Sequence, residues 1–233
     1  MNLFRERIKE SAVDFVMKEI KQLLLARRLK PGDRFPGEME LVNSLHVSRG
    51  SIREAMKVLA GFGIVEIRHG NGTYVAQRAK EATFDPLLFN LILTEANAGE
   101  IIELRHLIET GVVRLIIQKS DEEEFSDLRK AFQELHDLIA SGVSDPSVLA
   151  HSDINFHRAM GRATKNPLVE KVYSFVLEFF YPYIERVASK PNFGRNTLRN
   201  HSALLNGFIK RDVESVLRAL DAHSLTWRER AWD

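Results

Sequence analysis

The hydrophobic period changes partway through VSRGSIREAMKVLAGFGIVEIRHGNGTYVA, residues 47–76. In the first half, apolar residues recur at the spacing of one helical face as far as Leu59, and Ser48 stands where a helix cap is expected. In the second half, two β-branched runs flank HGNG, residues 69–72, and Asn-Gly is a strong hairpin signal. The stretch therefore predicts a helix to about Phe62, followed by a β-hairpin.

Two further helices are predicted upstream, at about residues 8–28 and 38–45. Between them, LKPGDRFPGE contains two prolines and two glycines, which cannot occupy a helix interior. Three small helices followed by a hairpin is the element order of a winged helix-turn-helix. We assign this domain to residues 1–76.

The predicted third helix separates its basic residues from its apolar ones. Arg49, Arg53 and Lys57 are spaced i, i+4 and i+8, so they share one face. A recognition helix reads base edges from its N-terminal residues, and its free N–H groups favour phosphate. Arg49 or Arg53 can take guanine bidentately, and the hairpin tip, His69 and Gly70, can enter the adjacent minor groove. The alternative is an ordinary solvated charged face, against which the order of turn, helix and hairpin argues.

The stretch from Arg34 to Ala76 resembles the DNA-binding domain of the GntR family of bacterial repressors. The shared features are P-x-E-x-x-L, V-S-R-x-x-[IV]-R-E-A, the G-[IL]-V turn and the G-x-G-T-[FY]-V ending. The resemblance implies that Arg49 and Arg53 contact DNA. It also implies roles near phosphate or at the wing tip for Ser48, Gly50, Ser51, His69 and Gly70. Many members carry arginine after the Glu of the P-x-E run, whereas this chain has Met39, so one DNA contact is expected to be missing.

Composition narrows the class of protein. Residues 1–80 hold 15 Lys and Arg against 9 Asp and Glu, whereas residues 81–233 hold 18 against 23. This asymmetry indicates two roles, with nucleic acid as the partner of the basic part. The chain has no cysteine, so disulfides and thiolate metal ligands are excluded. No run reaches the roughly 18 apolar residues of a membrane span, and MNLFRERIKE lacks a signal-peptide core, so we expect a cytoplasmic protein without a membrane partner.

From Asp85 onward the pattern is helical throughout. Helices are predicted at about residues 86–95, 98–119, 121–141, 146–165, 167–189, 195–210 and 212–230. Residues 85–233 are therefore predicted to form an all-α bundle with its own core, and the polar stretch at 77–84 is the predicted linker. The predicted fold class is mainly α, with a winged helix-turn-helix followed by a bundle of six to seven helices.

Four polar residues of the bundle are predicted to face its core: Asp153, His157, His201 and His223. Asp153 and His157 share one helical face, and each late histidine stands on an apolar stripe. A single inward histidine is most often a hydrogen-bonded core residue, but burying all four groups without a common partner is costly. A divalent cation satisfies them together, and three imidazoles with a carboxylate suit Zn²⁺, Ni²⁺, Mn²⁺ or Fe²⁺.

This predicted site carries a geometric condition. His201 and His223 are 22 residues apart, which is about 33 Å in an unbroken helix. They can share a metal only if the chain reverses between them. KRDVES, residues 210–215, offers such a break, with Asp212 as the candidate cap. His151 falls on another side of its helix and is predicted to be peripheral.

The helical half also resembles the FCD domain, the ligand-binding domain of the FadR-like branch of the family. The resemblance rests on E-L-R at 103–105, the D-x-x-x-H pair that begins at Asp153, Asn-Pro at 166–167, and the two late histidines. In metal-containing members the aspartate and three histidines are ligands, and effectors are commonly small carboxylates. The resemblance therefore implies metal ligation by the four residues named above and a carboxylate effector that chelates the cation.

An arginine is expected to pair with such a carboxylate, because a guanidinium matches it bidentately. Arg105 is the candidate, since apolar residues beside it on the same predicted helix face the core. The alternative is a surface salt bridge with Glu109, at i+4. Arg162 and the aromatic run FFYPY, residues 179–183, are weaker candidates for lining the pocket, and the run is equally explained as core or dimer contact.

Together these features predict a metabolite-responsive transcriptional regulator, most simply a repressor, and not an enzyme. A homodimer would place one recognition helix on each half-site of a pseudo-palindromic operator. Two alternatives remain open. One is a metal-sensing regulator, for which the cation is itself the effector. The other is a metallohydrolase built on the bundle, for which a motif-placed general base is missing.

Overall fold

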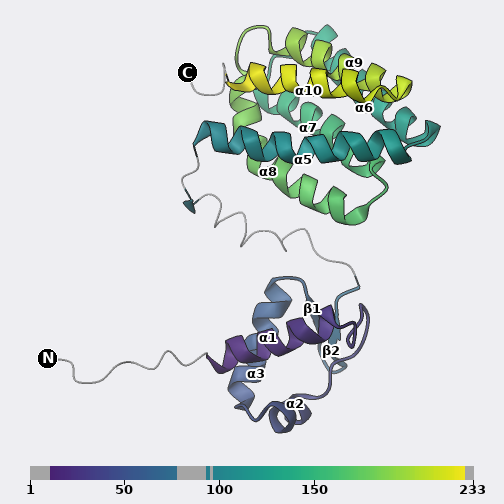
Figure 1. Cartoon of the computed structure of the whole chain (residues 1–233). Coiled ribbons are helices and arrows are strands. Elements are labelled where there is room, and N and C mark those ends of the chain that lie inside the picture. Colours follow the sequence, from purple (N-terminus) through teal and green to yellow (C-terminus); the bar gives the residue numbers. More distant parts are fainter. Residues whose placement is uncertain (1–10, 78–92, 95–96, 229–233) are drawn as a thin grey trace, which may run out of the picture. The chain divides into compact units, whose positions relative to one another are not determined.

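The computed structural model describes residues 11–77, 93–94 and 97–228, with side chains throughout these ranges except at Ala98 and residues 223–228. The chain separates into two compact units, Met1–Phe89 and Asn90–Asp233, each with its own buried core (Figure 1). Most of the predicted helix at 86–95 and nearly all of the predicted linker at 77–84 lie outside the described residues.

The first unit consists of three helices and a hairpin, which confirms the predicted winged helix-turn-helix. Its elements in chain order are α1 (Ala12–Leu25), α2 (Glu38–Leu45), α3 (Arg49–Gly61), β1 (Val65–Arg68) and β2 (Gly72–Val75). Helix α3 begins as predicted, because the Ser48 hydroxyl accepts a hydrogen bond from the backbone N–H of Ser51 at 3.1 Å. Its apolar face is buried and packs against α1 and the hairpin through Ile52, Ala55, Met56 and Leu59.

The hairpin forms where Asn-Gly predicts it, with Val65 opposite Val75 and Arg68 opposite Gly72. Its tight turn, however, is centred on His69 and Gly70, two residues before the Asn-Gly pair, because the backbone N–H of Asn71 donates to the carbonyl of Arg68 at 2.9 Å. Gly70 and Gly72 take the positive φ angles, 73° and 112°. Glycine adopts this left-handed region without the steric penalty of a side chain, so these two positions shape the wing tip.

The second unit is all-α among the described residues, which confirms the predicted bundle. Its helices are α5 (Ala98–Lys119), α6 (Glu122–Ala140), α7 (Pro146–Ala163), α8 (Pro167–Ala188), α9 (Phe193–Lys210) and α10 (Val213–Arg228). Helix α7 packs against both α6 and α8, and α10 packs against both α5 and α9 (Figure 1). Helix α7 buries eleven of its eighteen residues, including the polar Asp153 and His157. Among the described residues, no helix is both long and apolar enough to cross a membrane.

The break required between His201 and His223 is present. Helix α9 ends at Lys210, its C-cap Arg211 has a φ of 54°, and the Asp212 carboxylate accepts a hydrogen bond from the backbone N–H of Ser215 at 3.0 Å. This capping starts α10 and folds it back onto α9. The two helices approach closely at Gly207, where an added Cβ would lie 2.4 Å from Cγ2 of Val216.

Candidate DNA-reading surface and metal centre

The basic face of α3 is joined to α2 by one carboxylate. The Nε atom of Arg49 donates to Glu38 at 2.9 Å, and the Nε atom of Arg53 lies 3.3 Å from the other oxygen of the same side chain. Both arginine side chains remain more exposed than buried, at 62% and 61%. Glu38 therefore holds the two guanidinium groups beside each other at the surface.

The other predicted DNA-contacting residues also lie at the surface of this unit. Ser48 and Gly50 are exposed at the start of α3, Ser51 is half-buried beside them, and His69 and Gly70 are exposed at the turn of the wing. A groove of about 750 Å³ is lined by parts of α2, α3 and the wing, including Arg53 and both tip residues. Met39, which follows the Glu of the P-x-E run, is also exposed.

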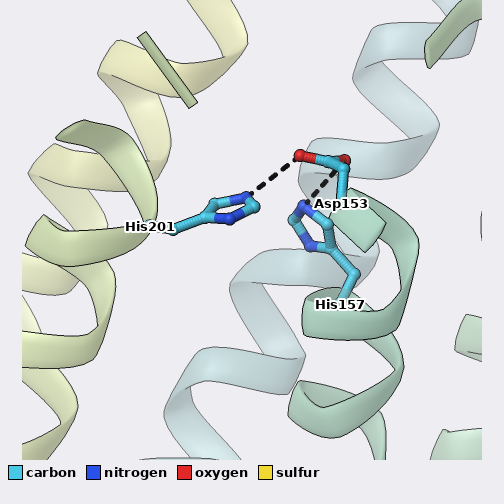
Figure 2. Close-up of side chains that lie close together, drawn as sticks. All are labelled: Asp153, His157 and His201. Carbon is cyan, nitrogen blue, oxygen red and sulfur yellow. Dashed lines mark ion pairs between the residues drawn. The ribbon is translucent and has the colours of Figure 1, made fainter. Parts of the chain in front are cut away.

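In the second unit, three of the four predicted metal ligands meet in the core. Helix α7 contributes Asp153 and His157, and α9 contributes His201 (Figure 2). One Asp153 oxygen lies 3.3 Å from Nε2 of His201, and the other lies 3.7 Å from Nε2 of His157. All three side chains are at most 1% exposed, and one ligand atom from each lies within 4.8 Å of the others.

This donor set fits a divalent cation. The Oδ2 atom of Asp153 is buried and has no hydrogen-bond partner among the described residues. Burial raises the pKa of the Asp153 carboxyl above its ordinary value, while His157 and Arg105 oppose that shift. A buried carboxylate with an unused oxygen, beside two imidazoles, offers the oxygen and nitrogen ligands that Zn²⁺ and similar ions take.

The fourth predicted ligand, His223, belongs to α10, but its side chain lies outside the described residues. Its backbone position can still be placed. His201 precedes the Arg211–Asp212 break by ten residues, and His223 follows it by eleven. In two helices that pack back to back after a short turn, these positions lie at about the same level.

Arg105 lies beside the cluster and not on the surface. Its Nη2 atom donates to Nε2 of His157 at 2.8 Å, and its Nε atom donates to Glu109 at 2.8 Å. The Arg105–Glu109 pair that we considered as an alternative does form, but it is a buried ion pair, with side chains 5% and 1% exposed. Arg105 is therefore in place both to contact a ligand at the cluster and to be oriented by Glu109.

Sequence reasoning missed two members of this polar network. Glu109 was considered only as a surface partner, and Tyr173 of α8 was not considered at all. The Tyr173 hydroxyl donates to Glu109 at 2.7 Å and lies 2.9 Å from Nδ1 of His157. The i,i+4 spacing from Arg105 was a signal for Glu109, whereas nothing in the sequence marks Tyr173 as a neighbour of a residue sixteen positions earlier.

The weaker sequence candidates have different positions. Phe180, from the run 179–183, is buried with its ring 5.3 Å from the Arg105 guanidinium, so part of that run borders the site. Tyr181 of the same run instead contacts His151, with its hydroxyl 3.0 Å from Nδ1, so His151 has a partner away from the cluster. Arg162 is exposed near the end of α7.

Comparisons with known proteins match both units. Residues 12–75 match the family described as bacterial regulatory proteins, gntR family, and residues 100–225 match the FCD domain. The transcriptional repressor NanR of an Enterobacter species is 25% identical over 96% of this chain and 88% of its own length. An uncharacterized HTH-type transcriptional regulator of Bacillus subtilis, YcbG, is 30% identical over 84% of this chain and 80% of its own.

The fold is also found among solved structures. A GntR protein of Streptococcus agalactiae superposes with a TM-score of 0.62 at 24% identity, covering 93% of this chain and 99% of that one. At this level of identity the likeness shows a common arrangement of helices and wing.

Proposed function

Because this chain belongs to the gntR family of bacterial regulatory proteins and carries an FCD domain, we propose that it represses transcription until a small carboxylate metabolite binds. As a member of that family, it is a DNA-binding regulator and not an enzyme. In this proposal residues 1–76 bind the operator in the cytoplasm and residues 85–233 bind the metabolite. Residues 77–84 are the linker between these two domains. The observation that carries the sensing role is the buried cluster of Asp153, His157 and His201 beside Arg105.

Asp153, His157 and His201 would hold a divalent cation, with His223 as the fourth ligand. The similar separations of His201 and His223 from the α9–α10 break, ten and eleven residues, support the inclusion of His223. The cation would supply a fixed positive charge with coordination positions open to a ligand. Zn²⁺, Ni²⁺, Mn²⁺ and Fe²⁺ all suit this donor set.

The effector would be a small carboxylate, and Arg105 would pair with it. A guanidinium presents parallel N–H groups that match a carboxylate, and Arg105 is already oriented by Glu109 through its Nε atom. Because Arg105 is buried at the cluster, a carboxylate there could reach both the guanidinium and the cation. An effector that binds one arrangement of the protein better than the other shifts the population between them.

The regulator would act as a homodimer, with one α3 helix on each half of the operator. An apolar groove on α5 and α8 is a suitable surface for a second copy. Leu107 and Leu168 are 69% and 75% exposed there, and Val172 is 45% exposed. Contiguous exposed apolar side chains of this kind commonly mark interaction sites. Leu168→Glu should therefore convert a dimer into monomers in sedimentation, whereas an unchanged sedimentation coefficient would remove this surface from the proposal.

The proposal is tested by separating metal binding from DNA binding. His201→Ala should lose the metal in elemental analysis, while its affinity for an operator selected from random duplexes, measured without effector, stays at the wild-type value. His151→Ala is the matched control, because His151 is exposed and bonds to Tyr181 away from the cluster. Carboxylates that raise the melting temperature of the metal-loaded wild type should not do so for His201→Ala. Full metal retention by His201→Ala would reject the site.

A second candidate function is metal sensing, which the same buried donor set favours if the cation itself is the signal. The two functions differ in one measurement. A metal sensor binds its operator with different affinities when stripped of metal and when loaded, without any carboxylate. A carboxylate-responsive repressor changes its affinity only when the carboxylate is added to the loaded protein.

A further inference from the structure

The hydrogen bonds around His157 fix which of its ring nitrogens carries the proton. The Tyr173 hydroxyl has a single proton to donate, and Glu109 offers it only acceptor oxygens. That proton is donated to Glu109 at 2.7 Å. The Tyr173 oxygen must then accept from Nδ1 of His157, 2.9 Å away.

The other ring nitrogen, Nε2, therefore carries a lone pair. The contact with Arg105 supports this assignment. A guanidinium can only donate, and its Nη2 atom lies 2.8 Å from Nε2, so Nε2 must be the acceptor. Nε2 is also the nitrogen that faces Asp153, at 3.7 Å, so it is the atom through which His157 would ligate a cation. Nδ1 is occupied by Tyr173 at 2.9 Å, also lies 3.3 Å from Glu109, and is farther from the Arg105 Nη2 atom, at 3.5 Å, than Nε2 is.

We propose that Arg105 and the cation compete for this one lone pair of His157, so that metal binding releases the Nη edge of Arg105 for a carboxylate effector. An imidazole nitrogen has a single lone pair, which cannot both accept a hydrogen bond and ligate a metal. The inference rests on the proposed metal site and adds an order to it. Glu109 still holds the Nε atom of Arg105, so the released guanidinium stays beside the cluster.

This exchange couples the two ligands. A carboxylate that engages the Nη edge removes the competitor from Nε2, so it tightens metal binding. By thermodynamic linkage, the metal must tighten carboxylate binding by the same factor. Arg105 thus lowers the affinity for metal in the absence of effector, although it belongs to the effector site.

The test measures Zn²⁺ affinity by competition with a chromophoric chelator, using the full chain without any carboxylate. Arg105→Met removes both the donor and the charge, whereas Arg105→Lys keeps the charge and shortens the side chain. Both variants should bind Zn²⁺ at least about tenfold more tightly than wild type. The factor follows because the cation no longer has to displace the hydrogen bond from the charged Arg105 donor to His157. Arg158→Met, on the exposed side of α7, is the control and should leave the affinity unchanged.

The outcomes separate the inference from the site on which it rests. If wild type and all variants bind no Zn²⁺, the proposed metal site is wrong and the exchange falls with it. If wild type binds but neither Arg105 variant binds more tightly, the site stands and the exchange is overturned. Tighter binding by Arg105→Met alone, with Arg105→Lys equal to wild type, indicates simple charge repulsion and also overturns it.

A spectroscopic measurement keeps the proposal testable if an Arg105 variant fails to fold. In chelator-treated wild type, two-bond ¹H–¹⁵N correlation of the imidazoles should show His157 protonated at Nδ1 and accepting at Nε2. Tyr173→Phe removes the acceptor at Nδ1 and should shift this ring towards the other tautomer. A wild-type His157 protonated at Nε2 would contradict the competition.

Discussion

The contact between α9 and α10 at Gly207 provides a quantitative test of how the bundle places His201 and His223. A methyl group at residue 207 would lie 2.4 Å from Cγ2 and 3.4 Å from the backbone nitrogen of Val216. Non-bonded carbon atoms pack at about 3.5–4.0 Å, so Gly207→Ala must move α10 or the Val216 side chain by roughly 1 Å. Val216 is fully buried, which leaves no free space to accept that movement.

The expected energy is the difference between two opposing effects. Overpacking a close-packed core costs about 1–3 kcal/mol. Alanine in a helix interior returns about 1 kcal/mol relative to glycine. Gly207→Ala alone should therefore destabilise the second unit by up to about 2 kcal/mol. The clash itself is isolated by Val216→Ala, which removes the Cγ2 atom, so the double variant should show a favourable coupling of about 1–3 kcal/mol.

Urea unfolding of the chelator-treated protein measures these free energies. Both tryptophans of the sequence, at positions 227 and 232, belong to the second unit, so their fluorescence follows that unit. Gly207→Ala alone should also weaken Zn²⁺ binding if α10 carries a ligand, and the double variant should restore it. Additivity of the two substitutions within about 0.5 kcal/mol would refute the close approach of the two helices at this point.

Three further predictions concern the DNA-reading surface and the acid stability of the bundle. Arg49→Ala should weaken operator binding and, if Arg49 contacts a phosphate, reduce the salt dependence by about one ion; an unchanged gel shift would remove Arg49 from the interface. Glu38→Gln removes the carboxylate that holds Arg49 and Arg53 and also a negative charge near the phosphates. It should tighten binding to random duplex and lower the ratio of specific to non-specific affinity in anisotropy titrations, whereas equal tightening on both duplexes would argue against a positioning role. Lys165, with help from the backbone N–H of Glu123, lowers the pKa of Asp121 to about 2. Because this folded-state pKa lies below the unfolded value of about 3.9, the stabilisation is present above that value and is lost as pH falls towards 2. Asp121→Asn keeps a capping oxygen but loses the charge, so its stability difference from wild type in urea should shrink over that range; a difference independent of pH would contradict the pairing.

Local patterns in the sequence were sufficient to predict most of the fold. Ser48 caps α3, and Asp212 caps α10 after the chain reverses, because a side-chain oxygen near a free backbone N–H acts over only a few residues. The hairpin was placed correctly for the same reason, although the turn depends on Gly70 in addition to the Asn-Gly pair. The sequence pattern becomes purely helical near residue 85, and the two compact units divide between Phe89 and Asn90.

The candidate site was predictable only in part. The i,i+4 pair of Asp153 and His157 and the inward stripe at His201 follow from helical period, and the structure brings these three residues together. Tyr173 could not be found in this way, because its meeting with His157 depends on how α8 crosses α7. The burial of Arg105 and Glu109 was also beyond local pattern, since each charge becomes tolerable in the core only through its partners there.

The packing of α10 against α5 affects the order in which this protein can fold. These helices come from opposite ends of the second unit, so their contact closes a loop of about a hundred residues. The winged unit, by contrast, is complete once residue 76 has left the ribosome. During synthesis from the N-terminus, a DNA-reading surface can therefore form before the helix that carries His223 exists. In a nascent chain, the domain that binds the operator would form before the domain that regulates this binding.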